Sequence, residues 1–215
     1  MLHVDIVIPT WRRPEKLERC LDSIQRQTYP YINVHAINDV DRLFAFGVWN
    51  RFLADWDNPW RDGDCFVYIC DDVELSPGCI ASALCDLERL WPDGDGMVGF
   101  HQSIAGRTDG WSASAMGLVG RAFAERFPDR QLFCPDYTRF HADAELGAYA
   151  KSLCRLSYCQ GANLIHYHPA HVKSEMDETH RIVREPAAVA ADKAAHEARK
   201  ARGLVWGTSF ERVNA

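Results

Sequence analysis

The chain has 215 residues, enough for one large α/β domain or two small ones, and 47% of them are hydrophobic, so it can bury a substantial core. Its formal net charge of −6 argues against a broadly basic nucleic-acid binder. No apolar run approaches the roughly 20 residues that cross a bilayer, and the N-terminal apolar stretch is too short for a signal peptide. Eight cysteines without a Cys-x-x-Cys pair argue against a zinc ribbon and favour reduced thiols. We therefore expect a cytoplasmic protein.

The first hundred residues alternate strand and helix patterns. A β-branched run closed by Pro9 predicts a buried strand, and Pro14 opens a segment whose apolar residues recur at helical spacing. The expected elements are strands over 3–10, 31–39 and 65–70 and helices over 14–27, 42–56 and 77–91. This alternation predicts a parallel sheet with right-handed crossovers, which binds ligands beyond the carboxyl ends of its strands.

The second half of the chain is less regular. We expect strands over 96–102 and 112–121, a helix that starts near Asp143, a short strand over 162–171 that ends at Pro169, and a tail helix from Glu185. No internal repeat is visible in the sequence.

Two adjacent carboxylates, Asp71 and Asp72, follow directly on the third expected strand. Like charges at the edge of a core repel one another and resist desolvation, so the pair needs a cation or hydrogen-bond donors. A divalent metal is one candidate, since Mg²⁺ and Mn²⁺ prefer carboxylate ligands. A solvated acidic turn is the alternative.

The stretch "DIVIPTWRRPEKLERCLDSIQRQTYPYINVHAINDVD" (5–41) resembles the opening of the family 2 glycosyltransferases of GT-A fold. "YICDDVELSPG" (68–78) is similar to their aspartate motif, and "HADAEL" (141–146) to their later acidic motif. The resemblance covers roughly residues 3–165. It implies an α/β, Rossmann-like GT-A fold of three layers with a mostly parallel central sheet. The expected division is a GT-A domain over 1–175, with a donor half over about 1–100 and an acceptor half over about 101–175, and a C-terminal helical tail over 176–215.

The resemblance implies a metal-dependent, inverting glycosyltransferase that moves a sugar from a nucleotide-diphosphate donor, with a UDP-sugar favoured, to a hydroxyl group. Bound Mn²⁺ or Mg²⁺ neutralises the leaving diphosphate in such enzymes. Asp72 would ligate the metal, and Asp71 would contact the ribose or a metal-bound water. Many relatives carry Asp-x-Asp here, whereas the first position in this chain is Cys70.

The donor is expected to contact several further residues by the same resemblance. Thr10 and Asp39 would flank the nucleobase, although Asp39 is also a typical strand-end turn residue. Arg12 or Arg13 could reach phosphate. Asn50 and Arg51 take the place of an Arg-Asn pair of relatives in reversed order. The candidate donor-binding residues are Thr10, Arg12, Arg13, Asp39, Asn50, Arg51 and Asp71.

Asp143 is the candidate general base, because it aligns with the acidic motif of the family and an inverting transfer needs a carboxylate to take the acceptor proton. A helix cap is its alternative role, and Glu145 is the second candidate for the base. His166 and His168 fall on one side of a strand and are candidate metal ligands. A structural role is the alternative for both histidines.

Trp111 and Tyr137 are candidate acceptor-side residues, because sugars and bases stack on aromatic rings. One candidate acceptor is a hydroxymethylated pyrimidine in duplex DNA, as in phage-type enzymes, with the basic tail on the phosphates. That tail carries Arg181, Arg184, Lys193, Arg199, Lys200 and Arg202. A cell-surface glycan or a lipid-linked acceptor is the alternative. A nucleotidyltransferase fits less well, since no Gly-rich phosphate loop follows the first strand. A non-catalytic nucleotide-sugar-binding module is the alternative of another class.

Overall fold

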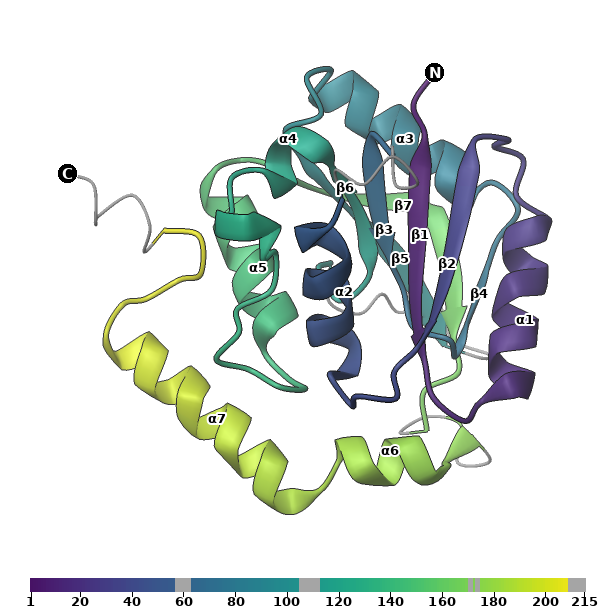
Figure 1. The fold of residues 1–215 in the computed structure, drawn as a ribbon. Coiled ribbons are helices and arrows are strands. Elements are labelled where there is room, and N and C mark those ends of the chain that lie inside the picture. The colour runs from purple at the N-terminus through teal and green to yellow at the C-terminus, as the bar shows by residue number, and fades with distance from the viewer. Residues whose placement is uncertain (57–62, 105–112, 170–171, 173–174, 209–215) are drawn as a thin grey trace.

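The computed structural model describes residues 1–56, 63–104, 113–169, 172 and 175–208. Within these residues a seven-stranded sheet has the order β2-β1-β3-β6-β5-β7-β4 (Figure 1). The strands are β1 (Val4–Thr10), β2 (Ile32–Asn38), β3 (Cys65–Tyr68), β4 (Val73–Leu75), β5 (Met97–Ile104), β6 (Gly117–Gly120) and β7 (Leu156–His166). Strands β4 and β6 run against the direction shared by the others. The predicted α/β fold with a mostly parallel central sheet is therefore confirmed.

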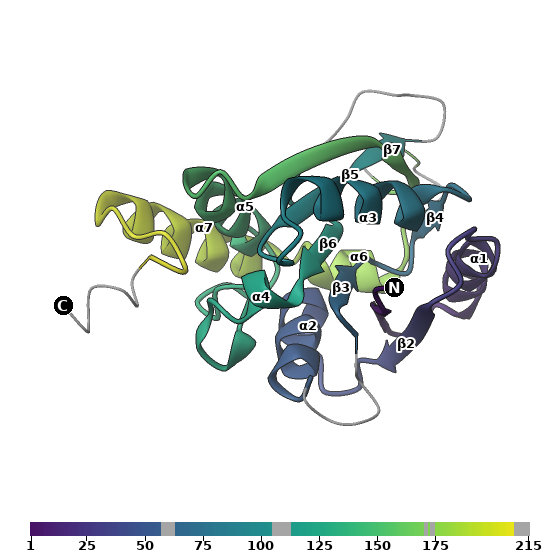
Figure 2. The ribbon, with the colours of Figure 1, turned by 90° about the horizontal axis from the view of Figure 1, so that it is seen from above.

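Alternation along β1 creates two apolar layers. Val4, Ile6 and Ile8 pack with α1 (Pro14–Gln25) and α3 (Cys79–Leu90), whereas Val7 packs with the helices of the opposite face. Those helices are α2 (Phe44–Ala54), α4 (Arg121–Ala124) and α5 (Ala142–Ser152). Figure 2 shows α3 and α2 on opposite sides of the sheet. Because side chains of a strand alternate between faces, one buried strand supplies both cores and gives the expected three layers.

Several element boundaries differ from the predicted ones. The expected strand over 162–171 is the second part of β7, which begins at Leu156. The strand expected over 112–121 is shorter, at Gly117–Gly120, and lies antiparallel between β3 and β5. Strand β4 and a short 3-10 helix, η1 (Pro128–Arg130), were not predicted, because three residues carry too little periodicity.

The C-terminal part crosses the carboxyl ends of β1 and β2 (Figure 1). It forms α6 (Glu178–Val183), which was not predicted, and α7 (Pro186–Ala201) close to the expected tail helix. Helix α7 is anchored on the domain through buried Asp192 and Arg199. No helix among the described residues is both long and apolar enough to cross a bilayer.

Candidate active site

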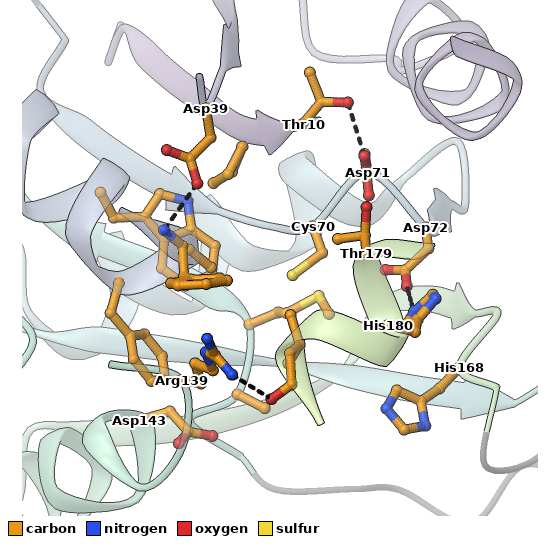
Figure 3. A pocket seen from close by; sticks show the side chains of 18 of the residues that line it. Thr10, Asp39, Cys70, Asp71, Asp72, Arg139, Asp143, His168, Thr179 and His180 are labelled. Carbon is orange, nitrogen blue, oxygen red and sulfur yellow. Dashed lines mark hydrogen bonds and ion pairs between the residues drawn. The ribbon is translucent and has the colours of Figure 1, made fainter. Parts of the chain in front are cut away.

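A pocket of about 370 Å³ opens beyond the carboxyl ends of β1 and β3 (Figure 3). The predicted residues that line it are Thr10, Arg13, Asp39, Asp71, Asp72, Asp143, His166 and His168. These residues come from both halves of the sequence, so the sheet does bring them to one crevice, as expected for a parallel α/β fold.

Arg13 supplies the positive charge that the carboxylate pair needs. Its Nη1 donates to Asp71 Oδ1 at 2.5 Å, and its Nη2 lies 3.5 Å from Asp72 Oδ2. Thr10 donates from its hydroxyl to the other oxygen of Asp71 at 2.8 Å. Burial raises the pKa of Asp71 to about 6, although Arg13 acts to lower it. Arg13 therefore neutralises part of the charge of the pair from within the protein.

Asp72 is held ionised by two histidines. His180 Nε2 lies 3.1 Å from Asp72 Oδ2, and His166 Nε2 lies 3.4 Å from Oδ1. Burial alone would raise the pKa of Asp72, but the neighbouring imidazoles of His166 and His180 and the charge of Arg13 hold this pKa well below its usual value. Asp72 is therefore the carboxylate of the pair that stays ionised to lower pH.

A charge network fastens the segment before α6 to α1. Asp177 accepts from Arg13 Nε at 2.8 Å and lies 2.9 Å from Lys16 Nζ. Its other oxygen lies 2.8 Å from His180 Nδ1. Thr179 donates to the carbonyl of Trp11 at 3.1 Å. These contacts place His180 against Asp72, so the C-terminal segment forms part of the pocket wall.

Cys70 directly precedes the carboxylate pair and lines the pocket. Burial raises the pKa of the Cys70 thiol well above its usual value, and the charges of Asp72 and Asp71 add to this effect. The thiol is therefore neutral at physiological pH and adds no negative charge to the carboxylate pair.

Asp143 lies on the opposite side of the pocket from Asp71 and Asp72 (Figure 3). It sits in the first turn of α5, which follows His141 in the left-handed conformation at φ 73°. Burial raises the pKa of Asp143 above its usual value, whereas backbone N–H groups of the first turn and His141 act to lower it. A carboxylate with a raised pKa, exposed to a pocket, is suited to accept a proton.

Asp39 lines the pocket, but its carboxylate is used by the backbone. Its two oxygens accept from the N–H groups of Leu43 and Phe44, each at 2.8 Å. This is the strand-end turn role that the sequence left open for Asp39.

His168 also lines the pocket, and burial, with the charges of His166 and Arg184, lowers its pKa to about 4.

Three predicted donor-binding residues lie outside the pocket lining. Asn50 makes two hydrogen bonds with the backbone of Phe133, at 2.7 and 2.9 Å. Arg51 pairs with Asp41 on the surface, and Arg12 is 69% exposed beside Glu178. The resemblance placed Asn50 and Arg51 near the donor, whereas the orientation of α2 directs them elsewhere.

Glu145 and Tyr137 are parts of a buried network beneath α7. Glu145 accepts from Arg199 Nε at 3.0 Å and from the Tyr137 hydroxyl at 3.0 Å. Arg199 Nη1 lies 2.5 Å from Asp136. Neither Glu145 nor Tyr137 lines the pocket. The predicted acceptor residue Trp111 lies outside the described residues.

The polar residues of the pocket wall that sequence reasoning missed include His180, Arg139 and Gln102. His180 belongs to a six-residue helix, and Arg139 to an irregular segment. In the sequence, His180 stands beside two basic residues, Arg181 and Arg184, and this is the one signal that pointed to the region.

Within the described part of the chain, no three Asp, Glu, His or Cys side chains form a ready metal cluster. One feature nevertheless fits a cation. Asp72 Oδ1 is buried without a hydrogen-bond partner among these residues, 3.4 Å from His166 Nε2. A carboxylate oxygen beside an imidazole nitrogen is a donor set suited to Mn²⁺. The residues present thus fit a divalent metal if Arg13 yields its 3.5 Å contact with Asp72.

No family model matches the chain, and no curated protein matches it. Among solved structures, S. aureus TarS aligns with a TM-score of 0.56 and 10% identity over 84% of this chain and 41% of TarS. The chain therefore spans about two fifths of that protein.

Two solved complexes are similar as well. TarS 1–349 in complex with UDP aligns at TM-score 0.58 and 11% identity, over 84% of this chain and 68% of that one. The mannosyltransferase PcManGT from Pyrobaculum calidifontis, in complex with GDP-Man and Mn²⁺, aligns at TM-score 0.57 and 14% identity, over 99% of this chain and 79% of that one. The chain thus shares its fold with TarS and with this mannosyltransferase.

Proposed function

We propose that this protein is a divalent-metal-dependent glycosyltransferase that moves a sugar from a nucleotide-diphosphate donor to a hydroxyl group, with inversion at the anomeric carbon. The observation that carries the proposal is the position of Asp71 and Asp72 across one pocket from Asp143 (Figure 3). The fold shared with structures that hold UDP or GDP-Man and Mn²⁺ supports this donor class.

On the donor side, Asp72 and His166 would hold the metal, while His180 contacts the other oxygen of Asp72 and His168 lies beside His166. The metal, when bound, neutralises the charge that develops on the leaving diphosphate. Arg13 remains against Asp71 and adds a fixed positive charge to the same wall. We favour UDP as the nucleotide, with GDP as the competitor to be tested.

On the acceptor side, Asp143 takes the proton of the attacking hydroxyl. Its raised pKa makes it a stronger base than an exposed aspartate. Apolar side chains of the lining, including Met116 and Phe140, keep water from competing with the acceptor. Attack from the Asp143 side, opposite the diphosphate, inverts the anomeric carbon.

A donor screen tests the proposal. The protein is incubated with UDP- and GDP-sugars in the presence of Mn²⁺ or Mg²⁺, and release of the nucleoside diphosphate is followed. We expect release with one donor family, and we expect Asp143→Asn to lower it by about 10²- to 10⁴-fold while nucleotide binding persists. Asp22→Asn, which alters an exposed aspartate on α1, serves as the control. Absence of release with every donor would contradict the proposal.

Three classes of acceptor remain to be compared: hydroxymethylated DNA, cell-surface glycans and lipid-linked acceptors. A hydroxymethylated pyrimidine in duplex DNA requires basic side chains for phosphates, and Lys193, Lys200 and Arg202 are exposed. Arg199 is withdrawn into ion pairs with Glu145 and Asp136. Transfer to hydroxymethylated DNA that does not weaken steeply with salt would remove the physical basis of this acceptor. Cell-surface glycans and lipid-linked acceptors belong in the same panel.

A non-catalytic nucleotide-sugar-binding module is the candidate of another class. The observation in its favour is the contact of Arg13 with both carboxylates, which supplies a counter-charge to the pair without a metal. Such a module would bind the nucleotide sugar yet show no turnover with any acceptor, in the wild type as in Asp143→Asn.

A further inference from the structure

Arg13, Arg139 and Arg199 are each about nine-tenths buried, with side-chain exposures of 8%, 10% and 10%. Arg13 and Arg199 each have a carboxylate oxygen at 2.5 Å. The nearest carboxylate recorded for Arg139 among the described residues is that of Glu185, at 3.9 Å and on a side chain that is 62% exposed. The Arg139 guanidinium therefore lacks the close carboxylate that the other two arginines have. A buried charge without a close partner is costly, so a bound anion would stabilise this guanidinium.

The polar contacts of Arg139 use only part of its guanidinium. Nη1 donates to the carbonyl of Ile182 at 2.5 Å and to that of Val183 at 3.4 Å. Cζ lies 4.3 Å from the centroid of the Phe44 ring, which supports the guanidinium from one side. Nε is buried and has no hydrogen-bond partner among the described residues. Among the described residues, no hydrogen bond is recorded for Nη2, and the N–H groups of this nitrogen remain for a ligand in the pocket.

The segment that carries Arg139 is fixed by a buried carboxylate. Asp192 of α7 accepts from the backbone N–H groups of Thr138, Arg139 and Phe140, at 3.0, 2.7 and 2.8 Å. Asp192 is itself 3% exposed. Three hydrogen bonds to one ionised acceptor hold this backbone in place, so the position of Arg139 is set before a ligand arrives.

Arg139 lines the pocket on the side of Asp143, across from Asp71 and Asp72 (Figure 3). A diphosphate held by the carboxylate pair and its metal would lie on the far side. The anion that Arg139 meets therefore belongs to another part of the substrates, close to the reacting hydroxyl.

We propose that Arg139 binds a carboxylate or phosphate group next to the reaction centre, carried either by the transferred sugar or by the acceptor. A guanidinium pairs with both groups through parallel N–H···O bonds. The substrate class is therefore acidic: a hexuronic acid donor, or an acceptor that bears an acid or a phosphate. The inference rests on the proposed function, since it assigns Asp143 to the acceptor side.

Matched ligands that differ in one charge test the inference by calorimetry. The donor arm compares the glucuronic acid and glucose derivatives of whichever nucleotide binds best. The acceptor arm compares glucuronate and glucose 6-phosphate with glucose, in the presence of that nucleoside diphosphate and Mn²⁺. Binding is measured rather than turnover, so the result does not depend on catalysis.

We expect one arm to show about 10²-fold tighter binding of the acidic ligand by the wild type, and Arg139→Gln to remove that preference. Arg139→Lys should retain part of it, because the charge stays but the paired geometry is lost. Arg89→Gln, at an exposed arginine on α3, is the control. No preference for the acid in either arm would overturn the inference.

A purely structural role of Arg139 predicts a different outcome. If the side chain only ties α6 and Phe44 together, Arg139→Gln weakens acidic and neutral ligands by the same factor, and this result also overturns the inference. The melting temperature of each variant shows whether it is folded. If Arg139→Gln does not fold, the preference for the acidic ligand is measured on Arg139→Lys instead. The wild type and Arg139→Gln could release nucleoside diphosphate from a neutral donor at the same rate. This result would leave the proposed function intact while the inference fails.

Discussion

Arg13 Nη1 lies 2.5 Å from Asp71 Oδ1, so an arginine that follows β1 neutralises a carboxylate that follows β3. The same guanidinium contacts Asp72 and Asp177, which makes it the common counter-charge of three acids. Removing one partner from a buried ion pair leaves an uncompensated charge, and this penalty is larger than the net worth of the pair.

Arg13→Gln should therefore lower the free energy of unfolding by about 3–5 kcal/mol in the presence of EDTA. Mn²⁺ should restore part of this loss, because a cation bound at Asp72 supplies the missing charge. Urea unfolding with EDTA and with Mn²⁺ measures both effects, and Arg89→Gln is the exposed control. An identical loss with and without Mn²⁺ would show that the carboxylates do not hold the metal.

The pH dependence of transfer should report on Asp143. A general base works in its ionised form, so kcat/KM falls as pH falls through the pKa of Asp143. Because burial raises this pKa, the acid limb of the profile should lie above the value of about 4 of an ordinary aspartate. Asp71→Asn should lower the rate but retain the limb, whereas Asp143→Asn should remove it. If Asp71→Asn removes the acid limb instead, the titration seen in kcat/KM belongs to the carboxylate pair and not to Asp143.

Asp5 should make the fold sensitive to acid. It is fully buried in β1 and accepts from Trp56 Nε1 at 2.8 Å and from Gly63 N at 3.1 Å, with His35 Nε2 at 2.9 Å. Burial opposes ionisation, but His35, Trp56 and Asn33 lower the folded-state pKa of Asp5 below its usual value. Its contribution is therefore present above the unfolded pKa of about 4 and is lost as pH falls through the folded pKa.

Asp5→Asn should lower the free energy of unfolding at pH 7 by about 3 kcal/mol, since buried donors lose an ionised acceptor. The difference from wild type should shrink as pH falls below about 4. Unfolding midpoints in urea between pH 3 and pH 7 test this, with Asp22→Asn as the exposed comparison. A difference that stays constant over this range contradicts the assignment.

Asp192→Ala should release the segment around Arg139. The N–H groups of Thr138, Arg139 and Phe140 lose their shared acceptor, which should cost about 3 kcal/mol. Asp192→Asn keeps one oxygen and should lose less. Limited proteolysis and urea unfolding measure the change, and Lys193→Ala, at an exposed neighbour on α7, is the control. Equal stability of Asp192→Ala and Lys193→Ala would show that the three hydrogen bonds do not hold the segment.

The sequence predicted most elements of the first hundred residues because the signals there are local. Buried β-branched runs mark β1 and β3, and Pro14 marks the start of α1. Polar residues that follow these strands must share one edge of the sheet, and Thr10, Asp71 and Asp72 do line one pocket.

The parts that escaped prediction depend on contacts between distant residues. His180 meets Asp72 across 108 residues of chain, and its helix has six residues, too few to show a period. The position of Arg139 depends on Asp192, 53 residues later. Strand β6 was expected, but its place between β3 and β5 follows from packing that a four-residue strand does not encode locally.

The contact of His180 with Asp72 also determines when, during translation, the pocket can form. Strands β1, β2 and β3 leave the ribosome before α6, and Arg13 can pair with Asp71 as soon as they associate. Residue 180 follows Asp72 by 108 positions, and α7 follows later still. A nascent chain that ends before α6 thus carries the acidic pair and its arginine but neither the His180 wall nor the Asp192 anchor. The emerging polypeptide would therefore complete the wall of this pocket only after α6 and α7 have been synthesised.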